Sequence, residues 1–167
     1  MPSVVSNSSP LISLSAIGRL DLLRDFFGMV IVPPAVWREV VEEGKGRAGT
    51  AEVETAVSEG WIQVKTFSND LLLRLLKRYL DEGEAEAITL PIEINASLIV
   101  LDETEARRIA DTYGMKKTGT IGILIRAKLA GKIGSLKDEM DRLRSEAGFR
   151  LEDRLYHQAL TAVGESA

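Results

Sequence analysis

The sequence predicts an α/β fold, namely a three-layer α/β/α sandwich around a central, mainly parallel sheet. Short apolar runs of β-branched residues alternate with helical patterns along the 167 residues, which is the order that produces βαβ units and a parallel sheet. In addition, the apolar run SLIVL stops at Asp102, and acidic side chains at the carboxyl end of a parallel strand lie where such sheets bind ligands. We expect residues 1–167 to form a single domain, since this length suits one core.

Composition excludes several classes of protein. The chain has no cysteine, which excludes disulfides, zinc–thiolate sites and thiol catalysis. We find no basic region followed by a long apolar segment at the N-terminus, and no apolar run approaching the ~20 residues of a membrane helix. We therefore expect a cytoplasmic protein with no membrane association.

Charge is unevenly distributed along the chain. The net charge is −4, but residues 1–106 hold nine basic and seventeen acidic side chains, whereas residues 107–144 hold ten basic and four acidic ones. An acidic focus followed by a basic flank suits a metal site that also meets phosphates. Solvated helix faces of differing composition would give the same pattern.

The elements follow from apolar periodicity and from turn and cap residues. Strands are predicted at four places: 3–6, 29–32, 61–66 and 97–101. Helices are predicted over 10–18, 20–28, 35–43, 51–60, 70–80, from 81 onward, 103–114, 120–131, 135–148 and 150–163. Lys45 to Thr50 is a Gly-rich polar loop.

Helix starts are indicated by small polar residues. Ser9 before Pro10 suggests an N-cap with proline at the first helical position. Ser68 or Asn69 can cap the helix that follows, and Ser135 can cap the helix of residues 135–148.

Four positions lie near a strand end or on the following helix and could bind a metal ion: Asn7, Glu39, Glu84 and Asp102. Hard cations such as Mg²⁺ take oxygen ligands and keep several waters, so two or three carboxylates suffice. Each position also has a structural interpretation. Asp102 with Glu105 resembles a capping box, Glu84 suits a helix start, Glu39 could be solvated, and Asn7 could satisfy backbone groups in a turn.

The segment KKTGTIG offers a possible phosphate contact. Free N–H groups at a helix start attract anions, Thr118 and Thr120 could cap that helix, and Lys116 and Lys117 add positive charge. Gly-Thr before a helix is equally ordinary capping. The P-loop and GxGxxG motifs are absent, and the only histidine, His157, is expected on the surface or in an interface.

Five motifs in order resemble the PIN-domain superfamily, in particular its DUF3368 group of short prokaryotic proteins. They are VVSNSSPLISLSAIGRLDLL, VIVPPAVWREVVEEG, LDEGEAEAITL, LIVLDETEARRIA and GTIGILIRAK. The resemblance implies an α/β/α sandwich, an acidic pocket holding Mg²⁺ or Mn²⁺, and cleavage of single-stranded RNA, often by VapC-like toxins paired with a small antitoxin. It also implies homodimerisation, for which apolar residues of the terminal helices could form a seam or could instead pack on the core.

The resemblance assigns roles to particular residues. Glu39, Glu84 and Asp102 match the second, third and fourth family acids, and Ser9 matches a hydroxyl near the metal. Residues expected to meet RNA are Ser9, Arg107, Arg108, Lys116, Lys117, Thr118 and Thr120.

One position departs from the family pattern. Asn7 stands where the family has its first aspartate, and a neutral ligand weakens the attraction for a divalent ion.

Three functional hypotheses follow from these residues. The first is a metal-dependent endoribonuclease with catalytic Glu39, Glu84 and Asp102. The alternative is a catalytically degenerate module that binds nucleic acid or regulates a partner. A phosphatase with Asp102 as nucleophile is a third hypothesis, but the chain lacks the DxD motif expected at the first strand of such an enzyme.

Overall fold

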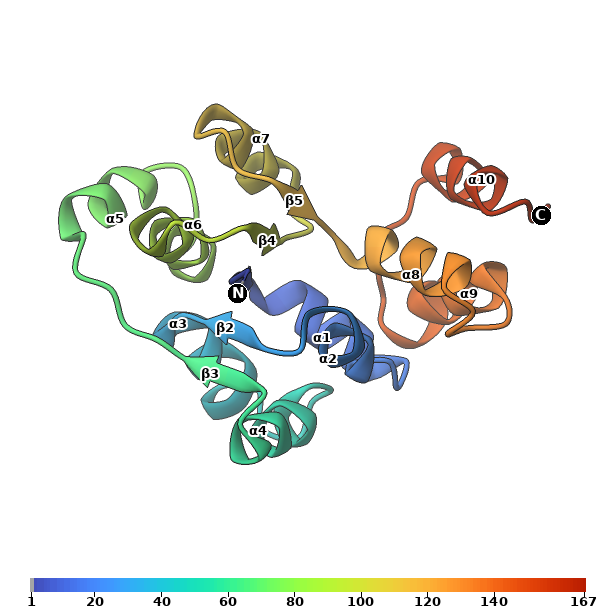
Figure 1. Cartoon of the computed structure of the whole chain (residues 1–167), viewed down its shortest axis with the longest axis horizontal. Helices are drawn as coiled ribbons and strands as arrows, with labels where there is room; N and C mark the ends of the chain where they lie inside the picture. Colours follow the sequence, from blue (N-terminus) through green and yellow to red (C-terminus); the bar gives the residue numbers. More distant parts are fainter. Residues whose placement is uncertain (1) are drawn as a thin grey trace.

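The computed structural model describes residues 2–167 and has a five-stranded parallel sheet at its centre (Figure 1). The strands are β1 (Val4–Ser6), β2 (Val30–Val32), β3 (Ile62–Val64), β4 (Leu98–Val100) and β5 (Lys117–Thr118). Their order is β3-β2-β1-β4-β5, and every pair is parallel. The predicted α/β/α class is confirmed.

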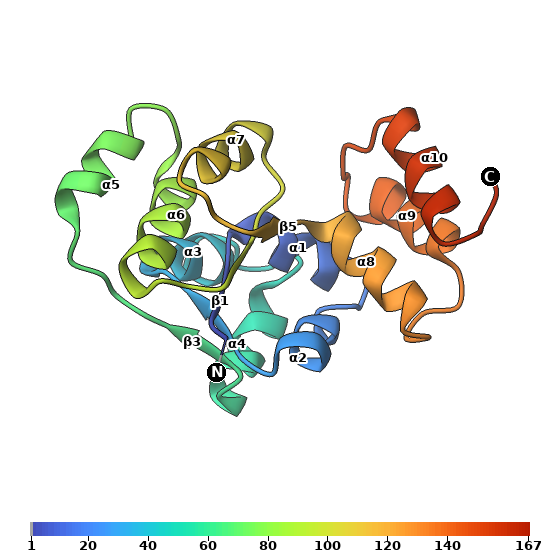
Figure 2. The same ribbon diagram turned by 45° about the horizontal axis from the view of Figure 1, so that its top comes forward.

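Helices connect the strands and cover both faces of the sheet. They are α1 (Ser8–Ala16), α2 (Asp21–Phe27), α3 (Pro34–Trp37) with the π-helix η1 (Arg38–Glu42), α4 (Thr50–Glu59), α5 (Asp70–Leu76), α6 (Glu82–Ile94), α7 (Thr104–Thr112), α8 (Thr120–Leu129), α9 (Leu136–Glu146) and α10 (Asp153–Ala162). In Figure 2, α9 and α10 lie beyond α8, on the side of the molecule away from α5. None of the helices within residues 2–167 is long and apolar enough to cross a bilayer.

Side chains alternate between the two faces of the sheet, as the period of a strand requires. Val30, Val32 and Ile62 join α1, α2, α4 and the C-terminal helices in the largest apolar cluster. Ile99 joins α5, α6 and α7 on the other face. Strands β1, β2 and β4 are therefore largely buried on both sides, which explains their continuous apolar runs.

The fifth strand was missed by the sequence pattern. Lys117 and Thr118 were expected in a turn before a helix, yet they pair with β4 through Leu101 N–H donating to the Thr118 carbonyl at 2.8 Å. A two-residue polar edge strand has no apolar run to reveal it. Residues 117–118 become a strand only by pairing with β4.

Several helix boundaries differ from the expected ones. Helix α1 begins at Ser8, so Asn7 rather than Ser9 occupies its N-cap, without a side-chain cap bond; the Ser9 hydroxyl is bonded to Glu103. Helix α5 ends at Leu76 rather than at residue 80. The predicted caps Asn69 and Ser135 are confirmed, since each accepts a hydrogen bond from the backbone three residues later.

The apolar residues of the terminal helices mostly pack on the core. Leu143, Leu151 and Leu160 are buried, and Phe149 and Val163 lie against the same cluster. Leu155 remains 45% exposed.

Candidate active site

The site lies at the carboxyl ends of β1 and β4. These two strands pair in register from Val4 and Leu98 to Ser6 and Val100, so the residues that follow them leave the sheet at the same edge. Asn7 follows β1 and donates its N–H to the Val100 carbonyl at 3.0 Å. Asp102 and Glu103 follow β4. The expected convergence of these positions at one sheet edge therefore occurs.

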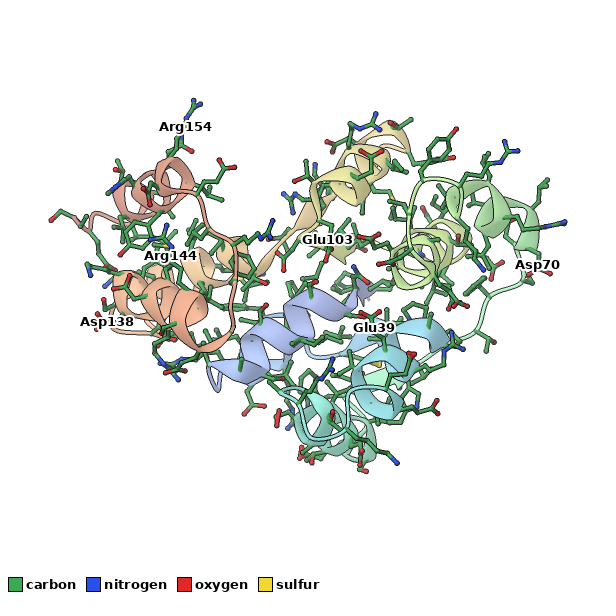
Figure 3. All side chains as sticks on the ribbon, turned by 180° about the vertical axis from the view of Figure 1, so that it is seen from behind. Glu39, Asp70, Glu103, Asp138, Arg144 and Arg154 are labelled. Carbon is green, nitrogen blue, oxygen red and sulfur yellow. The ribbon has the colours of Figure 1, made fainter. Side chains whose placement is uncertain are left out.

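Glu103, which the sequence reasoning did not select, is bonded at the centre of this site. Its Oε2 accepts a hydrogen bond from Asn7 Nδ2 at 3.1 Å, and its Oε1 accepts one from the Ser9 hydroxyl. Figure 3 shows Glu103 and Glu39 near the middle of the molecule, on different elements. The signal that could have revealed Glu103 is its place immediately after Asp102 at the end of a strand.

Glu39 is carried to the site by α3 and its π-helical continuation η1. The Ser8 hydroxyl donates to Glu39 Oε2 at 3.0 Å. The start of α3 is fixed by Glu86 of α6, a side chain only 6% exposed, which accepts the Ala35 N–H at 2.9 Å. π-Helical turns are rare and are often found at functional sites.

Glu84 belongs to a capping box at the start of α6. Asp81 accepts the Glu84 N–H at 2.8 Å, and Glu84 accepts the Asp81 N–H at 3.1 Å. The structural interpretation of Glu84 as a helix-start acid is thus confirmed. This bond uses one carboxylate oxygen of Glu84 and leaves the other without a protein donor within residues 2–167.

Gly83 leaves space between the acidic residues. A Cβ at this position would lie 2.8 Å from Glu39 Oε2, 3.7 Å from Asp81 Oδ1 and 3.8 Å from Asn7 Oδ1. Oxygens of three side chains therefore border the space that the missing side chain leaves open.

Asp102 is bonded to the start of α8. Its Oδ1 accepts the Thr120 N–H at 2.8 Å and its Oδ2 accepts the Thr120 hydroxyl at 2.7 Å. The capping box expected with Glu105 is wrong, because Glu103 is the N-cap of α7 and makes no side-chain cap bond there. Asp102 joins the end of β4 to α8 rather than starting α7.

The three acids selected from the sequence share one electrostatic property. Each of Glu39, Glu84 and Asp102 has a pKa above its usual value, and burial is the main cause in all three. The hydrogen bond from Ser8 offsets part of this rise in the pKa of Glu39, and the hydrogen bonds from Thr120 do the same for Asp102. The negative charge of Glu103 raises the pKa of all three. Glu103 is thus close enough to interact with each of them.

Two clefts of about 530 and about 540 Å³ border the acidic residues. Arg107, Lys117 and Thr118 line the first cleft, where Arg107 also donates to the Leu101 carbonyl at 2.7 Å. Ser9 and Glu103 line the second.

The other two expected basic residues lie elsewhere. Arg108 is exposed and paired with Glu105, and Lys116 lines a separate depression near Asn95 and Tyr113. The lone histidine, His157, is exposed on α10 and packs edge-on against Tyr156.

A model of the DUF3368 family, described as a PIN domain, matches residues 3–165. The chain belongs to the PIN-domain family. A search among curated proteins finds no match. PIN domains have a nuclease-type fold and generally use divalent metal ions.

The residues of this PIN domain suit a hard divalent ion held by few protein ligands. Within residues 2–167 no three Asp, Glu, His or Cys side chains stand close enough to form a complete metal site. The donors around Gly83 are nevertheless all oxygens, which is the ligand type that Mg²⁺ takes while keeping much of its water. An open, partly hydrated site fits these residues, whereas a closed cage of protein ligands does not.

Proposed function

We propose that this PIN domain is a metal-dependent endoribonuclease that hydrolyses single-stranded RNA with Mg²⁺ or Mn²⁺. The observation that carries the proposal is the position of Asp102 and Glu103 at the end of β4, where Asp102 borders a cleft that Arg107 and Lys117 also line and Glu103 borders the adjoining cleft. Acids at the carboxyl ends of parallel strands suit a metal ion, and the neighbouring cations suit the phosphates of a substrate.

Side-chain oxygens would hold the ion. They belong to Asn7, Glu39, Glu84 and Asp102, as the family pattern suggests, and to Glu103. When bound, the ion would polarise a phosphodiester and lower the pKa of a water ligand.

Hydrogen bonds position these groups, and cations beside them would meet the substrate. Asn7 and Ser9 orient the Glu103 carboxylate by their hydrogen bonds, and Ser8 orients Glu39. Asp102 fixes the start of α8 and, beside it, the strand that carries Lys117. Arg107 and Lys117 would bind phosphates of the RNA.

A second candidate is supported by the side chain of Asn7. Its amide donates to Glu103, so one acid of the family pattern is replaced by a neutral donor. A module that binds nucleic acid or a protein without cleavage would retain the fold and lose metal dependence. Such a protein would bind RNA equally with and without Mn²⁺.

The biological setting we propose is a VapC-like toxin that is inhibited by a small antitoxin and forms a homodimer. The membership of the PIN-domain family supports the toxin role. Leu155 on α10 is the exposed apolar residue of the terminal helices that a dimer could cover.

The proposal is tested by cleavage of a labelled single-stranded RNA in Mn²⁺ by the wild type, Glu103→Gln and Glu54→Gln. Glu54 is an exposed acid of α4 and serves as the matched control. We expect Glu103→Gln to lower the rate at least about 100-fold, the loss typical of a group that stabilises transition-state charge. Equal cleavage by all three proteins, or cleavage that persists in EDTA, would rule the proposal out.

A further inference from the structure

The connection between α9 and α10 lies against the acidic site. The two clefts have four lining residues in common, which are Asp102, Thr104, Phe149 and Arg150. The two clefts thus meet at this connection, next to an acid of the site. In Figure 2 the connection runs between the α9–α10 pair and the β5–α8 segment.

Hydrogen bonds hold the connection in a defined conformation. The Phe149 N–H donates to the Leu143 carbonyl at 3.0 Å. Arg144 donates to the Leu151 carbonyl at 2.5 Å and to Asp153 at 3.1 Å, while its guanidinium lies 4.4 Å from the centre of the Tyr156 ring. Leu151 is 9% exposed and belongs to the core. The segment is therefore preorganised, and a ligand would not have to order it.

The side chains of the connection have the chemistry that single-stranded nucleic acids bind. Phe149 is half-buried and lines both clefts. Arg150 is exposed and has no ion pair or side-chain hydrogen bond within residues 2–167. An aromatic ring on which a base stacks, next to a cation that meets its phosphate, is the usual arrangement of sequence-tolerant single-strand sites.

The charges around the connection favour a polyanion along one wall. Arg107 and Lys117 line the same cleft as Arg150, and Lys117 is also paired with Asp111. The opposing charges are Asp102 and Glu152 in that cleft and Glu103 in the other. A strand bound along Arg107, Lys117 and Arg150 would pass the acidic residues at one end.

We propose that Phe149 and Arg150 bind a single-stranded nucleic acid beside the acidic site, with a base stacked on the Phe149 ring and a phosphate on Arg150. This inference rests on the proposed function, because it names the segment that holds the substrate. Phe149 and Arg150 are positioning residues and take no part in bond cleavage.

The test measures binding in EDTA, so that it does not depend on turnover. A labelled oligouridine of about ten nucleotides, and an oligothymidine of the same length, are titrated with each protein by fluorescence anisotropy. The variants are Phe149→Leu, which keeps an apolar side chain against the core, and Arg150→Gln. The control is Arg154→Gln, since Arg154 is exposed on α10, lines neither cleft and points away from the middle of the molecule (Figure 3).

We expect Phe149→Leu to weaken binding by about fivefold or more, the loss of one stacked base. Arg150→Gln should reduce the slope of log affinity against log salt by about 0.7, the value for one phosphate contact on a single strand. Arg154→Gln should change neither quantity. Tighter binding of the RNA than of the DNA would add a contact to the 2′-hydroxyl.

The inference is overturned if Phe149→Leu and Arg150→Gln bind like Arg154→Gln, or if the wild type binds neither oligonucleotide. Thermal unfolding of each variant checks that the fold is intact. Failure of the proposed function has a different signature, since loss of Mn²⁺-dependent cleavage would leave these metal-free affinities unaffected. Cleavage with unchanged binding in both variants would refute this inference alone.

Discussion

The two sides of the acidic site differ in what their carboxylates are bonded to. On the β4–α8 side, both oxygens of Asp102 accept hydrogen bonds from Thr120. On the α3–α6 side, Glu39 accepts one hydrogen bond, from the Ser8 hydroxyl, and faces the open space at Gly83. Acids that match one family pattern can therefore divide between holding the fold and presenting charge.

A glycine lies against the acid on each side, and the two glycines show the same difference. A Cβ on Gly83 would meet the end of the flexible Glu39 side chain at 2.8 Å. A Cβ on Gly119 would meet Asp102 Oδ1 at 2.6 Å and the Leu101 carbonyl at 3.2 Å. The α3–α6 side can therefore adjust to an added methyl group, whereas the β4–α8 side cannot.

Asn7→Asp should have the largest effect on the metal-free protein. Asn7 is 3% exposed and donates to Glu103, so an aspartate would bring a buried carboxylate against the half-buried carboxylate of Glu103. We expect a loss of about 3 kcal/mol in the free energy of unfolding, measured by urea denaturation in EDTA. Mn²⁺ should restore much of this loss by binding the folded state. An equal loss with and without Mn²⁺ would show that no ion binds between these residues.

Asp102→Ala should destabilise the protein by about 2 kcal/mol, because Thr120 is fully buried and its N–H and hydroxyl would lose their acceptors. Asp102→Asn keeps an oxygen that can accept the Thr120 N–H, so its loss should be smaller. Urea denaturation at pH 7 measures both. If the alanine variant is as stable as the wild type, Asp102 does not fix the start of α8.

Gly83→Ala should separate stability from activity. Replacing a helical glycine with alanine stabilises a helix by about 0.5–1 kcal/mol, but the new methyl group would displace the Glu39 carboxylate. We expect an unfolding free energy equal to or above that of the wild type, together with weaker RNA cleavage. The matched variant Gly119→Ala should lose stability, since its methyl group would meet the Asp102 Oδ1 that accepts the Thr120 N–H and would crowd the Leu101 carbonyl. Reduced stability in Gly83→Ala with full activity would contradict this account.

Glu39→Gln should have the smallest effect, with a distinctive pH dependence. Burial raises the pKa of Glu39 above 4.5, so its ionised form is disfavoured in the folded state and costs stability above that pKa. Glutamine removes this cost and should stabilise the metal-free protein at pH 7. The side chain is more than a third exposed, so we expect less than about 1 kcal/mol. The advantage should shrink as the pH falls toward 4.5, because wild-type Glu39 becomes protonated. An advantage that grows with acidification would be the opposite of this result.

The sequence predicted those parts of the fold that depend on local pattern. Strands β1, β2 and β4 were found because their apolar runs are largely buried on both faces, and β3, which is exposed at Gln63 and Val64, was found from its alternation. The caps Asn69 and Ser135 were found because their side chains act on the next turn. Strand β5 was missed because Lys117 and Thr118 become a strand only by pairing with β4.

The site could be predicted only as far as chain position determines it. The places of Asn7 and Asp102 at strand ends followed from the parallel sheet. That Asp102 bonds Thr120 and that Glu103 bonds Asn7 and Ser9 depends on side-chain directions after β4 and on contacts between residues far apart in sequence. The roles of Phe149 and Arg150 were not anticipated, because the packing of α9 and α10 against α8 brings their connection to the clefts.

The central claim is that Glu103 and its neighbours bind a divalent ion. Calorimetric titration of Mn²⁺ into the wild type, Glu103→Gln and Glu54→Gln tests it most directly. Saturable binding to the wild type and Glu54→Gln, weakened at least about tenfold in Glu103→Gln, is the result that we expect. No binding to the wild type at millimolar Mn²⁺, or the same affinity in all three proteins, would contradict the claim and favour the metal-independent module.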